Sequence, residues 1–88
     1  MSFFEFDPAK SQINYEKHGI DFIEAQRLWQ DPHFTVRMSN FPGEARYLGI
    51  GRIDEFIWTS IFTYRGFTIR LISVRRARYG EKVLYEAD

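Results

Sequence analysis

The residues of this chain that could do chemistry are mostly arginines, and they gather near its end. Five arginines and no acidic residue lie between Arg65 and Arg78, in the stretch TYRGFTIRLISVRRAR. A guanidinium group is permanently charged and can hold phosphate oxygens through two parallel hydrogen bonds. The cluster therefore favours a site for a phosphate-containing anion. For any single arginine, pairing with an acid such as Glu16, Glu81 or Glu86 is an equally good explanation.

His18, in the stretch EKHGI, is the second candidate. It falls at the expected end of a helix, where the helix dipole favours a cation, and it could donate a proton or face a phosphate. A histidine beside a capping glycine is more often structural. A metal site is not indicated, because the other histidine, His33, stands 15 residues away, no acid lies at ligand spacing and the chain has no cysteine. We expect neither a metal nor a cofactor.

Such a set of residues suits RNA cleavage. The ribose 2′-OH is a nucleophile already placed beside the phosphate, so the protein must only position the phosphate, offset its charge and assist proton transfer. Arg65, Arg75 and Arg76 could do the first two. His18 could do the third, with Glu81 and Tyr85 as weaker candidates.

The first half of the chain predicts two helices after a short strand. The aromatic stretch at 3–6 is typical of a strand, and Asp7-Pro8 is typical of a helix start. This helix should run to about Lys17 and stop at Gly19. A second helix is predicted over 20–31. Its capping-box spacing is Asp21 to Glu24, and its apolar face holds Phe22, Ala25 and Trp29.

The second half alternates with a period of two. Strands are predicted over 33–38, 46–53, 55–64 and 67–75, with breaks at Asp54-Glu55 and Arg65-Gly66 that are short enough for hairpins. Alternation in the last strand groups its residues into two faces: Arg70, Ile72, Val74 and Arg76 on one, and Ile69, Leu71, Ser73 and Arg75 on the other. A short helix over 81–87, with Gly80 as its N-cap, closes the chain.

These elements predict one α+β domain over residues 1–88. We expect a single antiparallel sheet of about four to five strands, with the two N-terminal helices packed on one face and a short C-terminal helix. The formal net charge is zero, but residues 1–44 hold four basic and seven acidic residues, whereas residues 45–88 hold eight basic and five acidic ones. This asymmetry favours a local anion site over a globally basic nucleic-acid binder. The chain has no signal-peptide pattern and no membrane span, so we expect it in the cytoplasm.

The order of motifs along the chain closely resembles the BrnT family of bacterial toxins. The matching pattern is E-aromatic-D-x-x-K, then N-x-x-K-H-G-(I/V)-x-F-x-E-A, G-R, (V/I)-aromatic-T-x-R-G, and R-(I/L)-I-S-x-R-R-A with a later E and Y. In this chain the pattern falls on Glu5, Phe6, Asp7, Lys10, Asn14, Lys17, His18, Gly19, Ile20, Phe22, Glu24, Ala25, Gly51, Arg52, Ile61, Phe62, Thr63, Arg65, Gly66, Arg70, Leu71, Ile72, Ser73, Arg75, Arg76, Ala77, Glu81 and Tyr85.

The resemblance implies a type II toxin with a RelE-like fold that cleaves RNA without a metal ion and arrests growth. It implies a BrnA-like ribbon-helix-helix antitoxin that blocks the toxin in a heterotetramer of two copies each. The toxin would reach operator DNA only through that antitoxin. On this basis we expect Arg65, Arg75, Arg76 and His18 to be catalytic. We expect Arg52, Arg70 and Lys17 to bind RNA phosphates, and Glu81 or Tyr85 to be possible proton-transfer groups.

Two alternatives remain open at this point. The chain could be a catalytically inactive homologue that binds an antitoxin and acts as a corepressor, since aromatic residues and arginine are enriched in protein interfaces. It could also be a non-catalytic nucleic-acid-binding module. The zero net charge argues against the latter, because non-specific affinity comes mainly from neutralising phosphates.

Overall fold

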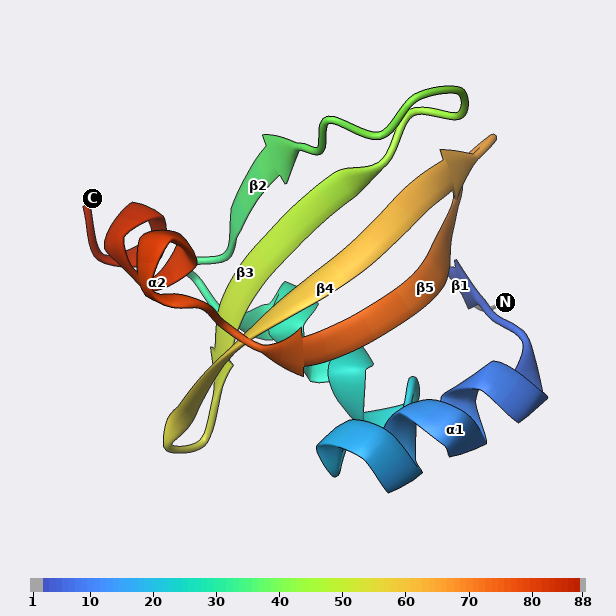
Figure 1. Ribbon diagram of the computed structural model, residues 1–88, viewed down its shortest axis with the longest axis horizontal. Coiled ribbons are helices and arrows are strands. Elements are labelled where there is room, and N and C mark those ends of the chain that lie inside the picture. Colours follow the sequence, from blue (N-terminus) through green and yellow to red (C-terminus); the bar gives the residue numbers. More distant parts are fainter. Residues whose placement is uncertain (1–2, 88) are drawn as a thin grey trace.

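The computed structural model describes residues 3–87 and confirms the α+β class (Figure 1). A sheet of five strands is accompanied by two α-helices and one 3₁₀ helix. In chain order the elements are β1 (Phe4–Glu5), α1 (Pro8–His18), the 3₁₀ helix η1 (Glu24–Gln30), β2 (Thr35–Met38), β3 (Tyr47–Ile53), β4 (Phe56–Arg65), β5 (Thr68–Arg76) and α2 (Tyr79–Glu86). No helix within residues 3–87 is long and apolar enough to cross a membrane.

The strands lie in the order β1-β5-β4-β3-β2. The predicted antiparallel meander is confirmed for β2 to β5, with short turns at the two expected breaks. The prediction of a purely antiparallel sheet is wrong, because β1 pairs in parallel with β5 through Phe4 opposite Ile69 and Glu5 opposite Arg70. A helix rather than a hairpin follows β1, so no local turn fixes the direction in which this strand pairs.

Helix α1 begins and ends as its sequence predicts. The Asp7 carboxylate accepts a hydrogen bond from the Ala9 N–H at 2.9 Å, and Pro8 occupies the first turn. Gly19 ends the helix with φ at +79°, a left-handed conformation that costs glycine little.

The prediction that two N-terminal helices pack on one face is wrong. The second segment is the 3₁₀ helix η1, which starts only at Glu24, although Asp21 accepts hydrogen bonds from the N–H groups of Ile23 and Glu24 as a cap would. Helix α1 instead lies along the edge of β5. The side-chain amide of Asn14 donates to the Val74 carbonyl at 2.8 Å and accepts from the Val74 N–H at 3.1 Å. These bonds replace those of a neighbouring strand, because the two-residue β1 leaves this part of the edge open.

Helix α2 covers the opposite face of the sheet from η1 (Figure 1). It begins at Tyr79 with Arg78 as its N-cap residue, two residues earlier than the predicted start at Glu81 with Gly80 as the N-cap. The Arg78 N–H donates to the Glu81 carboxylate at 2.8 Å, so an acid on the first turn of the helix supplies the cap. On its apolar side, Tyr85 forms a small cluster with Ile50 and Ile57 of the sheet and with Ala77.

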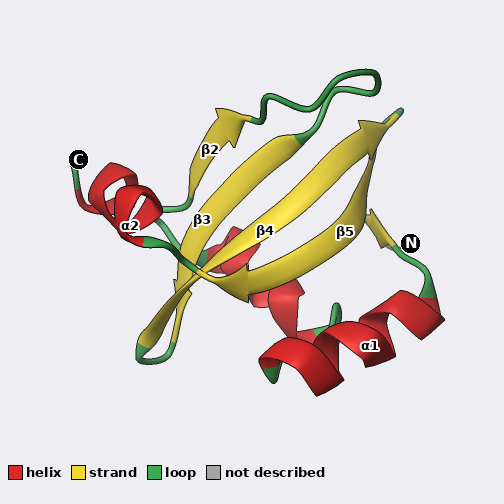
Figure 2. Cartoon of the chain, in the orientation of Figure 1, coloured by secondary structure: helices red, strands yellow, loops and turns green. Residues whose placement is uncertain are grey.

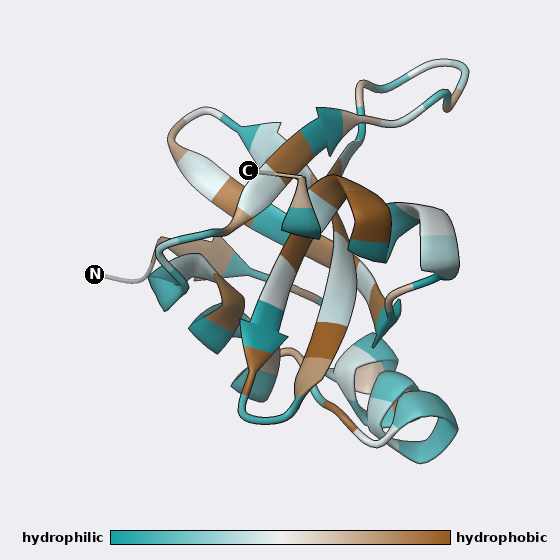
Figure 3. Cartoon of the chain, turned by 90° about the vertical axis from the view of Figure 1, so that its left-hand side faces the viewer, coloured by the Kyte–Doolittle hydropathy of each residue, from teal (hydrophilic) through white to brown (hydrophobic). Residues whose placement is uncertain are grey.

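The main core lies between the sheet and the segment 20–30. Its buried members come from both, and hydrophobic and hydrophilic residues alternate along the strands that contribute them (Figure 3). Gly49 makes this packing possible, because a Cβ atom there would stand 2.4 Å from Cζ of Phe34. The buried residues of the cluster are Ile20, Phe22, Ala25, Leu28, Ile53, Trp58, Phe62, Leu71 and Val74.

The predicted alternation along β5 breaks at a bulge. The register shifts between Ile61, which faces Ser73, and Phe62, which faces Leu71, so Ile72 has no partner on β4. Leu71 and Val74 therefore both enter the main core, although they were predicted on opposite faces. The bulge exchanges the two faces for the residues that follow it. Ser73 and Arg75 therefore share a face with Arg70, whereas Val74 and Arg76 lie on the other face.

Candidate functional site

A groove between α1 and β5 brings together four of the predicted site residues. It consists of two adjoining cavities of about 190 and 150 Å³ that share Lys10 and Ile72. We call this surface the basic groove. Its lining residues are Asp7, Lys10, Glu44, Arg46, Arg65, Arg70, Leu71 and Ile72 in the larger cavity, and Lys10, Ile13, Asn14, Lys17, His18, Ile72 and Ser73 in the smaller.

Two structural features shape the groove. The Asn14 side chain fixes α1 against the backbone of β5, and the bulge places the unpaired Ile72 at the junction of the two cavities. Ser73, which follows the bulge, lines the smaller cavity. The groove is therefore a product of the sheet edge and the helix together, and neither element would form it alone.

The arginines of the groove are only loosely neutralised. The Arg65 guanidinium lies 3.4 Å from the Glu44 carboxylate, and half of its side chain is exposed. The Arg70 guanidinium donates to Glu5 at 2.9 Å in a pair that is also partly exposed. Five lysines and arginines line the groove against two acids. This surplus of positive charge, open to solvent, suits a polyanion.

His18 is the last residue of α1, and Lys17 precedes it. Both side chains line the smaller cavity, while Arg65 and Arg70 line the larger. A phosphate chain that lies along the groove would meet guanidinium groups at one end and an imidazole at the other. The groove thus holds a group that can transfer protons and cations that can offset phosphate charge.

Sequence reasoning missed two basic residues of the groove. Lys10 lies two helical turns before Lys17, so the period of the helix could have placed both on one face. Arg46 carried no such signal, because the loop before β3 brings it to the groove. Within residues 3–87, Nε of Arg46 is buried and has no hydrogen-bond acceptor.

Arg75 lies on the same face of the sheet as Arg70, but another residue occupies its guanidinium. It donates two hydrogen bonds of 2.8 Å to Glu81 of α2, and both side chains are largely buried, with 17% and 13% exposed. Thr59 also donates to this carboxylate at 2.8 Å. The hydrogen bond from Arg75 lowers the pKa of Glu81 to about 2, and it raises the pKa of Arg75. Glu81 is thus a fixed anion that holds α2, which disfavours it as a proton carrier at neutral pH.

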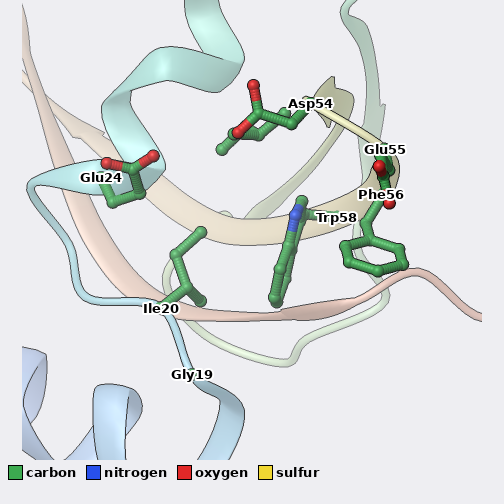
Figure 4. A pocket seen from close by; sticks show the side chains of 8 residues that line it. Gly19, Ile20, Glu24, Asp54, Glu55, Phe56 and Trp58 are labelled. Carbon is green, nitrogen blue, oxygen red and sulfur yellow. The ribbon is translucent and has the colours of Figure 1, made fainter.

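Arg76 lies on the other face of the sheet, away from the groove. Its guanidinium carbon stands 3.7 Å from the ring centre of Phe56 and 5.6 Å from that of Trp58. These rings line a separate cavity of about 260 Å³ whose other walls include Glu24, Asp54 and Glu55 (Figure 4). Arg27 pairs with Glu24 and Asp54, so this cavity, unlike the groove, has no surplus of positive charge to hold a phosphate.

Tyr85 and Arg52 lie outside the groove, where both contact Asp31. The Tyr85 O–H and the Arg52 backbone N–H both donate to one Asp31 oxygen at 2.7 Å. Burial and this hydrogen bond raise the pKa of Tyr85. Burial opposes ionisation of Asp31, but its hydrogen bonds from Tyr85 and from the backbone lower its pKa overall. Together these contacts tie α2 to the segment after η1.

The comparisons with known proteins are consistent with this arrangement. No curated protein matches the chain at a significant level. Residues 6–81 match the family model described as the ribonuclease toxin BrnT of type II toxin–antitoxin systems. The match includes β5, every residue that lines the groove, and Arg75 and Glu81, which anchor α2. The chain therefore belongs to the BrnT family of ribonuclease toxins of type II toxin–antitoxin systems.

Proposed function

We propose that this toxin cleaves RNA in the basic groove and needs no metal ion to do so. The observation that carries the proposal is that His18 and Lys17 share one continuous groove with Lys10, Arg65 and Arg70. Guanidinium and ammonium groups offset phosphate charge as a divalent cation would. Within residues 3–87, no three acidic or histidine side chains gather into a cluster that could hold a metal.

The proposed reaction uses the nucleophile of the RNA itself. The ribose 2′ oxygen attacks the adjacent phosphorus as its proton leaves, a 2′,3′-cyclic phosphate forms, and the bond to the 5′ oxygen breaks with a proton delivered to that oxygen. Lys17, which lines the same cavity as His18, offsets the charge that builds on the oxygens of the scissile phosphate, and Arg65 and Arg70 hold the neighbouring phosphate of the strand. His18 transfers a proton, either from the 2′ oxygen or to the 5′ oxygen.

The experiment is cleavage of a labelled single-stranded RNA by purified toxin in EDTA. We expect cleavage to persist in EDTA, to cease on an RNA that carries 2′-O-methyl groups throughout, and to fall at least a hundredfold in His18→Ala. His33→Ala is the matched control, because this exposed histidine lies outside the groove, and it should cleave like the wild type. Circular dichroism checks that each variant is folded.

Three results would contradict the proposal. Loss of activity in EDTA that Mg²⁺ restores would show that a metal is required. Equal loss in both histidine variants would remove His18 from the mechanism. A folded wild type that cleaves nothing, with or without ribosomes, would favour a catalytically inactive toxin homologue that binds its antitoxin.

We further propose that the antitoxin is a BrnA-like ribbon-helix-helix protein. The toxin family implies an antitoxin partner, and the toxin exposes large apolar side chains such as Phe3, Met38 and Phe67 that a partner could cover. Light scattering on the co-expressed pair should give a complex of two toxins and two antitoxins. Operator DNA should bind this complex but not the toxin alone.

A further inference from the structure

The loop between β2 and β3 carries a stacked pair of side chains at the mouth of the basic groove. The guanidinium carbon of Arg46 stands 3.8 Å from the ring centre of Phe41, and 45% of Phe41 is exposed. Arg46 also lines the larger cavity of the groove with Arg65 and Arg70. One planar cation thus borders both an aromatic ring and the proposed phosphate site.

The base of this loop is held in place. The Ser39 N–H donates to the Arg46 carbonyl at 2.8 Å, and the buried Thr63 hydroxyl donates to the Ala45 carbonyl at 2.6 Å. The loop and the turn between β4 and β5 lie at the same end of the sheet (Figure 2). The backbone of Arg46 therefore has a fixed position relative to Arg65, which ends β4.

Among the described residues, no carboxylate forms an ion pair with Arg46. The nearby carboxylate, Glu44, contacts Arg65, and Nε of Arg46 is buried without an acceptor among the described residues. Single-stranded RNA is recognised by stacking of its bases on aromatic rings and on guanidinium planes, which every base can do. An arginine whose guanidinium carbon lies 3.8 Å from the centre of an exposed ring, beside the proposed phosphate site, offers such a plane.

We propose that Phe41 and Arg46 form a stacking platform for the base next to the scissile phosphate. The platform positions the substrate and takes no part in bond making. The inference rests on the proposed function, because it places the RNA backbone in the basic groove. It makes the β2–β3 loop the part of the toxin that holds a flipped-out base, and so selects single-stranded RNA over a duplex.

The first test needs no variant. Cleavage sites of the wild type are mapped on one RNA, and single abasic positions are then placed around the preferred site in a version made uncleavable by a 2′-O-methyl group at that site. We expect Kd to rise five- to hundredfold when the base next to the scissile phosphate is missing. Kd should change little when a base at any other position is missing. A Kd that does not depend on which base is removed would overturn the platform.

The second test uses a matched pair of variants. Phe41→Leu removes the aromatic ring of the platform. Phe56→Leu removes the ring of the other Arg–Phe stack, which lies on the opposite face of the sheet. The exposed fraction of Phe56 is 44%, nearly the same as that of Phe41. Phe41→Leu should raise KM about tenfold with kcat within twofold, and should no longer respond to the missing base. Phe41→Trp should restore both, and Phe56→Leu should cleave like the wild type.

The outcomes separate this inference from the proposed function. A wild type that cleaves, together with Phe41→Leu that keeps its KM, overturns the platform alone. Equal increases in KM for Phe41→Leu and Phe56→Leu also overturn it, because the effect would then be general. A wild type that cleaves nothing contradicts the proposed function. A scan of single abasic positions along a short single-stranded RNA then tests the platform, because Kd should rise at one position for the wild type, and a Kd that rises at none overturns the platform.

Discussion

At the scale of single residues, the surroundings of an arginine decide what it can do. Arg75 and Arg65 carry the same group, but 17% of the Arg75 side chain is exposed, against 53% for Arg65. Arg75 is bound at two points by Glu81, whereas Arg65 lies 3.4 Å from Glu44 and faces the groove. A guanidinium that already has a buried partner is costly to release, so the exposed one is the better phosphate ligand.

Arg65 and Arg76 provide a direct test at this scale. Arg65→Ala should lower kcat/KM for RNA cleavage about 10- to 10²-fold, because it removes a charged donor that holds the RNA backbone. Arg76→Ala should keep wild-type cleavage and lose only about 1 kcal/mol of stability, since it removes a stack on Phe56 at the other face. Equal losses of activity in the two variants would contradict the placement of the site.

The pair of Glu81 and Arg75 predicts how stability depends on pH. The hydrogen bond from Arg75 lowers the pKa of Glu81 from 4.5 to about 2 in the folded protein. Because the folded pKa is depressed, the stabilisation is complete above about pH 4.5 and is lost as the pH falls towards 2. Glu81→Gln should therefore cost about 2–3 kcal/mol at pH 7 and much less at pH 2.

Urea unfolding at pH 7, 4 and 2.5 measures this difference. Glu86→Gln is the control, because this exposed acid at the end of α2 has no such partner in the described part of the chain. A constant difference between wild type and Glu81→Gln across the three pH values would show that the carboxylate charge is not what holds α2.

At the scale of elements, Asn14 joins α1 to the sheet. Its amide satisfies the N–H and carbonyl of Val74 and donates to the Ile20 carbonyl, all of them buried bonds. Asn14→Ala should cost about 2–4 kcal/mol, because it leaves buried backbone groups of β5 without partners. Gln12→Ala, which removes an exposed amide from the same helix, should change stability by less than about 0.5 kcal/mol.

Cleavage measurements extend this prediction to the groove. In Asn14→Ala the helix that carries His18 is no longer fixed against β5, so kcat should fall even where the variant remains folded. Thermal unfolding followed by circular dichroism gives the stability, and RNA cleavage well below the midpoint temperature gives the activity. Wild-type kcat in a folded Asn14→Ala protein would show that the helix needs no such anchor.

Local signals explain which elements could be predicted from the sequence. The caps of α1 and the two hairpin turns are set by residues within a few positions of each other, so Asp7, Gly19 and the Asp54-Glu55 break identified them. The parallel pairing of β1 and the bulge at Ile72 depend on contacts between distant segments. The bulge changes which side chains face each other, so the alternation that was read from Arg70 onward fails at Val74.

The candidate site was predictable only in part, for the same reason. Arg65, Arg70, Lys17 and His18 were singled out from the sequence, because their charges and positions are visible there, and all four line the groove. Whether an arginine is free or paired is decided by residues brought from elsewhere, as Glu81 is for Arg75. Arg46 was missed, since only the fold brings the β2–β3 loop to the groove.

At the scale of the whole molecule, the zero net charge conceals two opposed faces. The basic groove lies on one face of the sheet and holds a surplus of cations. The other face holds the cavity drawn in Figure 4, where Arg27 pairs with Glu24 and Asp54. Such a molecule has an electrostatic field that draws a polyanion towards the first face rather than the second. RNA should therefore reach the groove in a preferred orientation.

Salt dependence tests this distribution of charge. With four to five cations in contact with phosphates, log K for uncleavable single-stranded RNA should fall against log salt with a slope of about −3. Lys10→Ala should make the slope less steep by about 0.7 units, while Lys82→Ala, on α2, should leave it unchanged. A slope near zero in the wild type would mean that the groove does not bind the RNA backbone.

The pairing of β1 with β5 also determines how much of the chain must be translated before the groove can form. Glu5 and Arg70 stand 65 positions apart, and Asn14 and Val74 stand 60 apart, yet each pair must meet before α1 and β5 enclose a groove. Contacts between such distant segments form late in folding. A nascent chain, or a product cut short, that lacks β5 has no groove and should cleave no RNA. The proposed activity thus begins only after β5 has been made.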